Sequence, residues 1–174
     1  MKPAATFIVF ALLASSWTGS PLSAGEDQPN SHIQVVLKNL ADKKYTLPAG
    51  DYVLLAQQPV GVVTETIIYE LDAEHVVCVP GTHARTEINR QPLSKSKAKL
   101  VRDIVSTDSV QSLPRDSGHV GFDGSAFVAI IRLSNRTKMI GHWSPDAPAV
   151  DLLIAILDRE IQTRRHRLQN QDRP

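Results

Sequence analysis

The sequence GSAFVAIIRLSNRTKMIGHWSPDAPAVDLLIAILDREI, residues 124–161, decides the fold. Residues 127–133 are almost continuously apolar and rich in β-branched side chains, which is typical of a central strand buried on both faces. Residues 134–136 form a polar break, and residues 137–143 then alternate between two faces. Two such runs around a short polar break predict a β-hairpin.

A core-facing helix is predicted directly after this hairpin. Ser144 or Asp146 can cap it, and either Pro145 or Pro148 fits in its first turn. The next apolar residues recur at helical spacing and form one stripe: Val150, Leu153, Ile154, Leu157 and Ile161. Three charged residues lie off this stripe and are expected to face water: Asp158, Arg159 and Glu160.

A second unit of two strands and a helix precedes this one. Strands are predicted at residues 62–71 and 75–79, with a turn between them. After a polar segment, Ser94 or Ser96 opens a helix whose apolar stripe is Leu100, Val101, Ile104 and Val105. The order predicts an α+β fold, in which an antiparallel sheet carries two helices packed on one face as a ββαββα core.

This core is assigned to residues 62–162, and a β-rich portion is expected before it. Residues 25–61 begin with a polar leader and then include two short apolar runs. The first of these runs, at residues 32–37, is predicted to be a strand, and the second is residues 52–56.

The N-terminus has the layout of a secretory signal peptide. Lys2 supplies a short positive region, and residues 7–14 are an apolar run too short to span a bilayer. We expect cleavage after Ala24, which makes residues 1–24 the signal peptide; an uncleaved membrane anchor is the alternative. The expected location is the bacterial periplasm or the exterior, with no stable membrane span after cleavage.

The charge balance and the cysteine content limit which functions and which kinds of stabilisation are expected. The chain has 19 Lys and Arg residues against 18 Asp and Glu residues, a balance that does not indicate nucleic-acid binding. Its single cysteine, Cys78, cannot form an internal disulfide, so the exported domain must be held together by its core. The basic tail, residues 163–174, is interpreted as a helix end, where cations are favourable.

A family resemblance covers about residues 67–161. Tyr69-Glu70-Leu71 enters a hairpin, Leu93-Ser94 precedes a helix, and Asp123-Gly124 is followed by Phe127 on the next strand. This pattern resembles small exported bacterial α+β domains of unknown function with a strand-strand-helix duplication, and it looks somewhat like emfourin-type metalloprotease inhibitors. The resemblance implies an inhibitor function, but no inhibitory residue is carried over from it.

The sequence contains no complete catalytic motif. It has no Gly-x-Ser-x-Gly nucleophile elbow and no Gly-rich phosphate-binding loop with its lysine. His119, Asp123 and His142 would suit zinc if the loop before the central strand lies over its hairpin, although scattered surface histidines are the favoured interpretation. No cofactor is expected.

Two long polar loops, residues 82–92 and 107–120, are the candidate binding surfaces. They contain the tentative partner-binding residues, which are Arg85, Arg90, Leu113 and Arg115. We therefore expect a non-enzymatic protein-binding domain of the cell envelope, in its narrower forms a protease inhibitor or an immunity-type protein. A metal-dependent hydrolase and an envelope ligand-binding or structural module are the alternatives.

Overall fold

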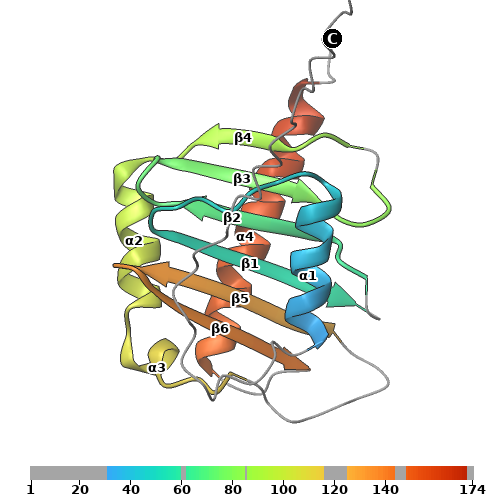
Figure 1. Ribbon diagram of the computed structural model, residues 1–174. Coiled ribbons are helices and arrows are strands. Elements are labelled where there is room, and N and C mark those ends of the chain that lie inside the picture. Colours follow the sequence, from blue (N-terminus) through green and yellow to red (C-terminus); the bar gives the residue numbers. More distant parts are fainter. Residues whose placement is uncertain (1–30, 60–61, 85, 116–124, 144–147, 172–174) are drawn as a thin grey trace, which may run out of the picture.

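The computed structural model describes residues 31–59, 62–84, 86–115, 125–143 and 148–171, with the backbone alone for residues 142–143 and 164–171. Six strands in these ranges form one antiparallel sheet of order β4-β3-β2-β1-β5-β6 (Figure 1). The strands are β1 Tyr52–Pro59, β2 Glu65–Glu70, β3 His75–Pro80, β4 Asn89–Pro92, β5 Ser125–Leu133 and β6 Arg136–Trp143. The helices are α1 Ser31–Asp42, α2 Lys95–Val105, α3 Asp108–Gln111 and α4 Pro148–Gln171. The predicted α+β class and antiparallel sheet are confirmed.

Strand β1 lies in the middle of the sheet. Tyr52 is paired with Glu70 of β2 on one side and with Arg132 of β5 on the other. Residues 52–56 are all buried, because helices and a connecting segment cover both faces of the strand. The second apolar run of the N-terminal portion is therefore a central part of the main sheet.

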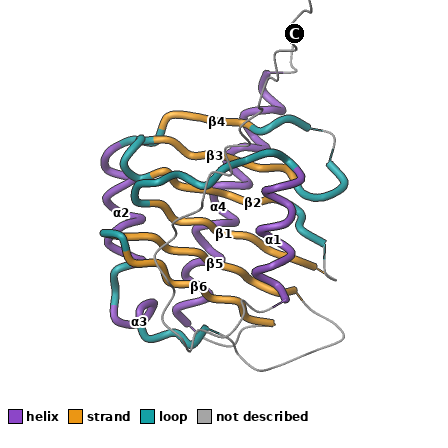
Figure 2. Tube along the Cα trace, viewed as in Figure 1, coloured by secondary structure: helices purple, strands orange, loops and turns teal. Residues whose placement is uncertain are grey.

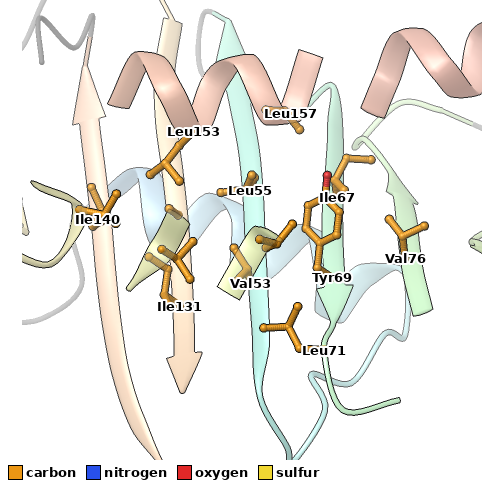
Figure 3. Packing of buried hydrophobic residues seen from close by; sticks show 14 of the residues in the cluster. Val53, Leu55, Ile67, Tyr69, Leu71, Val76, Ile131, Ile140, Leu153 and Leu157 are labelled. Carbon is orange, nitrogen blue, oxygen red and sulfur yellow. The ribbon is translucent and has the colours of Figure 1, made fainter. Parts of the chain in front are cut away.

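Helices α2 and α4 pack on one face of the sheet. Leu153 and Leu157 of α4 point toward the strands, where Figure 3 shows them above Leu55, Ile67 and Tyr69. Val101 and Val105 of α2 belong to the same apolar cluster. The last turns of α4 extend past β4, so this helix continues through residues that were assigned to the tail (Figure 1).

Helix α1 covers the opposite face, and this corrects the sequence analysis. The strand predicted at residues 32–37 is wrong, because these residues lie inside α1. Ile33, Val36 and Leu40 recur at helical spacing, and they pack on the side of the sheet that faces away from α4 (Figure 2). Burying this stripe favours a helix over the local β propensity of the valines.

Several local predictions agree with the structure. Ser134 and Asn135 have φ values of 48° and 66°, the left-handed conformations that a tight hairpin turn between β5 and β6 requires. Ser94 caps α2, since its hydroxyl accepts the N–H of Lys97 at 3.3 Å. The polar segment before α2 also contains a short edge strand, β4, which pairs with β3.

Replacing Leu153 with Ala should destabilise the protein strongly. Its side chain is fully buried between α4 and the sheet, and such truncations cost about 2–5 kcal/mol. Leu152→Ala is the matched control, because Leu152 is 43% exposed and should cost less than about 0.5 kcal/mol. Urea unfolding followed by circular dichroism measures both variants, and equal losses would contradict the packing described for α4.

Candidate functional site

A groove of about 460 Å³ lies between α2 and α4, on the face of the sheet that carries these two helices. Its floor is Tyr69 of β2, and its walls are the facing sides of the two helices. Helix α2 contributes Lys97, Leu100 and Ile104, and helix α4 contributes Ile156, Arg159 and Glu160.

Leu100 is the most exposed large apolar side chain among the described residues. It is 54% exposed, whereas its neighbour Val101 is buried against the sheet. Successive helical positions differ by about 100°, so the residue before Val101 points sideways from the core, toward α4. The apolar stripe of α2 is therefore wider than its contact with the sheet, and its outer part forms one wall of the groove.

A charged pair, Lys97 and Glu160, is part of the lining of the groove. Glu160 is only 6% exposed, and its carboxylate accepts a hydrogen bond from the ammonium group of Lys97. The Tyr69 hydroxyl lies 3.4 Å from the same oxygen, and the Lys97 nitrogen lies 5.9 Å from the centre of the Tyr69 ring. The expectation that Glu160 faces water is wrong, because it lies three residues after Leu157 on the buried row of α4 and so faces the sheet.

Burial controls the protonation of the tyrosine in this cluster. Removal from water raises the pKa of Tyr69 well above its usual range, and the negative charge and hydrogen bond of Glu160 raise it further. The phenol therefore stays neutral and donates a hydrogen bond to the carboxylate of Glu160. The carboxylate of Glu160 thus links α4 to α2 through Lys97 and to β2 through Tyr69.

A second polar cluster lies on the opposite face and includes one predicted site residue. Arg90 of β4 donates to Glu70 at 2.8 Å, and Tyr45 donates to the same oxygen at 2.7 Å. The nearest nitrogen of His75 is 3.9 Å from the other oxygen. Burial, followed by the hydrogen bond and charge of Glu70, raises the pKa of Tyr45. Arg90 is thus anchored at its guanidinium group.

The other predicted partner-binding residues lie elsewhere. Leu113 is buried and Arg115 is half-buried, and both lie beside β6, where the Arg115 carbonyl accepts the N–H of Gly141 at 2.9 Å. Strands β4 and β6 are the two edges of the sheet, about 24 Å apart at ~4.8 Å per strand. Arg85 lies outside the described residues. The structure therefore does not bring Arg90 together with Leu113 and Arg115.

The alternative metal ligands cannot be located in the same way. His119 and Asp123 lie outside the described residues, as does the side chain of His142. Within the described ranges, no three His, Cys, Asp or Glu side chains are placed so that they could hold a metal ion. Cys78 is buried there, and its thiol lies 2.6 Å from a carboxylate oxygen of Glu65.

The groove was not predicted, although part of its signal is visible in the sequence. Leu100, Val101, Ile104 and Val105 occupy two adjacent rows of one helix, which is more apolar surface than a short amphipathic helix needs for one contact. The contribution of α4 is harder to see, because Arg159 looks like an ordinary surface residue and Glu160 is charged although it lies at helical spacing from Leu157.

No family model, no curated protein and no solved structure matches this chain. In the part of the chain that the structure describes, no helix combines the length and the apolar character needed to cross a bilayer.

Stability should fall at alkaline pH through Tyr69. The raised pKa means that the folded protein keeps a proton that the unfolded chain releases above about pH 10. The contribution of Tyr69 to stability is complete below pH 10. Above pH 10, the free energy of unfolding should fall by about 1.4 kcal/mol per pH unit because of this group.

Urea unfolding at pH 9, 10 and 11 tests this expectation with Tyr69→Phe as the comparison. Other groups titrate equally in both proteins, so the wild-type curve should be steeper by the contribution of the one phenol. Parallel curves would show that Tyr69 is not held neutral by the fold.

Proposed function

We propose that this protein is an exported, non-enzymatic binding protein that holds a segment of another protein in the groove between α2 and α4. The observation that carries the proposal is Leu100, a large apolar side chain left 54% exposed on the wall of a groove. Exposed apolar surface bordered by polar residues is typical of protein interaction sites.

The shape of the groove favours a helical segment as its occupant. Two helices packed side by side on a sheet leave an apolar channel along their length, and an amphipathic helix buries its apolar face in such channels. Leu100, Ile104 and Ile156 supply the apolar contacts. The proposal treats β2–β3–α2 and β5–β6–α4 as two strand-strand-helix units, whose helices together form the channel.

The charges around the groove favour acidic residues beside the apolar face of this segment. Arg159 lines the groove and has no acidic partner among the described residues. Lys95 and Lys99 of α2 are also highly exposed, at 86% and 75%, although each lies near a carboxylate of its own chain, Glu74 at 4.0 Å and Asp103 at 2.5 Å. Complementary charge on a partner would speed association and set its orientation.

The export signal expected from the sequence makes the cell envelope the site of action. A protease inhibitor and an immunity-type protein are the narrower forms of the proposal, and both require tight one-to-one binding. The geometry supports the groove ahead of the two loops, because Arg90 is tied to Glu70 and Leu113 is buried.

A photo-crosslinking amino acid at position 100 tests the groove directly. In the organism that makes the protein, it should yield one dominant cross-linked protein. Ile88 is the matched control position, because it is also a large, partly exposed apolar residue, at 37%, and does not line the groove. A cross-link from position 88 with none from position 100 would place the partner elsewhere.

A charged residue at position 100 tests how much the groove contributes to the affinity for that partner. Leu100→Asp puts a charge into the apolar contact and should weaken binding by about 100-fold or more, a cost typical of an interface hot spot. Ile88→Asp should bind normally, and both variants should unfold near the wild-type urea midpoint. Unchanged affinity in Leu100→Asp would remove the groove from the proposal.

A further inference from the structure

A second recess of about 770 Å³ lies on the face of the sheet that carries α1. It is bordered by the C-terminal part of α1, by residues 44–49, and by the start of β1 and the end of β5. Its apolar lining includes Leu37, Leu47 and the largely buried Tyr52. The volume is within the range of about 300–1,000 Å³ that is usual for small-molecule sites.

The charges at this recess are all positive. Lys44 and Arg132 are the only charged residues that line it, and neither has an acidic partner among the described residues. This distinguishes Arg132 from Arg90 and Arg102, each of which is paired with carboxylates.

The register of the sheet places Arg132 beside the buried Tyr52 in the lining of the recess. It lies directly opposite Tyr52 in the pairing of β5 with β1. The two side chains are close enough that the positive charge of Arg132 partly offsets the increase that burial causes in the pKa of Tyr52. An unpaired, half-buried guanidinium group beside an apolar recess is complementary to an anion attached to a hydrocarbon chain.

We infer that this recess binds a single-chain fatty carboxylate. Its carboxylate pairs with Arg132 and Lys44, and its chain lies along Leu37, Leu47 and Tyr52. A guanidinium group can hold a carboxylate through two parallel hydrogen bonds, which an ester or an alcohol cannot accept in the same way. The site is separate from the groove between α2 and α4, because it is on the other face of the sheet.

The affinity should depend both on the length of the hydrocarbon chain and on the charge of the carboxylate. Each additional methylene group buried in the recess should strengthen binding by about fourfold until the recess is full. Loss of the charge should weaken binding by about tenfold or more, the value of a hydrogen bond to a charged group.

Isothermal titration of the purified protein with octanoate, decanoate and laurate, below their micelle concentrations, tests this inference. We expect one site per chain, tighter binding with each longer chain, and binding of methyl laurate that is at least about tenfold weaker than that of laurate. Ester binding equal to that of laurate, or no saturable binding, would overturn the inference. Binding only to vesicles of an anionic two-chain phospholipid would also overturn it, in favour of a membrane-surface role.

Arg132→Gln and Lys44→Gln should each weaken laurate binding, and Arg132→Lys should retain more affinity than Arg132→Gln. Lys38→Gln is the matched control, because Lys38 is an exposed cation of α1 that does not line the recess. Equal weakening in Lys38→Gln would reduce the effect to overall charge and overturn the inference. Leu100→Asp should bind laurate normally, so failure of the groove proposal and failure of this one are separable.

Discussion

The pairing of β1 with both β2 and β5 is the constraint on which the rest of the structure depends. One side of β1 joins the strands that lead to α2, and the other side joins the hairpin that leads to α4. Because residues 52–56 are buried on both faces, the sheet needs cover on each side. Helices α2 and α4 supply it on one face, and α1 with the segment that follows it supplies it on the other.

This two-sided arrangement separates two kinds of surface. On the face that carries α2 and α4, Glu160 connects the two helices through its contact with Lys97, and the space between them is the apolar groove. On the other face, α1 covers only part of the sheet, and the recess lies beside it. The proposed protein partner and the proposed fatty carboxylate therefore have independent sites, and each can be tested without the other.

The sequence predicts the hairpin of β5 and β6, the stripe of α4 and a serine cap of α2 at Ser94 or Ser96, because each depends on local periodicity or turn chemistry. Helix α1 was missed because the β-branched residues before Leu37 resemble a strand, and the helical pattern is complete only when Leu40 is included. The groove depends on the lateral spacing of α2 and α4, which no local pattern encodes. Glu160 was missed for a different reason: it lies at helical spacing from Leu153 and Leu157 and so faces the sheet, but its charge made it look like a surface residue.

Amide hydrogen exchange of the protein isolated with its bound partner tests the central claim most directly. The account predicts added protection within residues 96–104 of α2 and 156–163 of α4, with little change at the two edges of the sheet. Protection confined to residues 86–92 and 107–115, with the two helices unchanged, would contradict it and place binding on the loops.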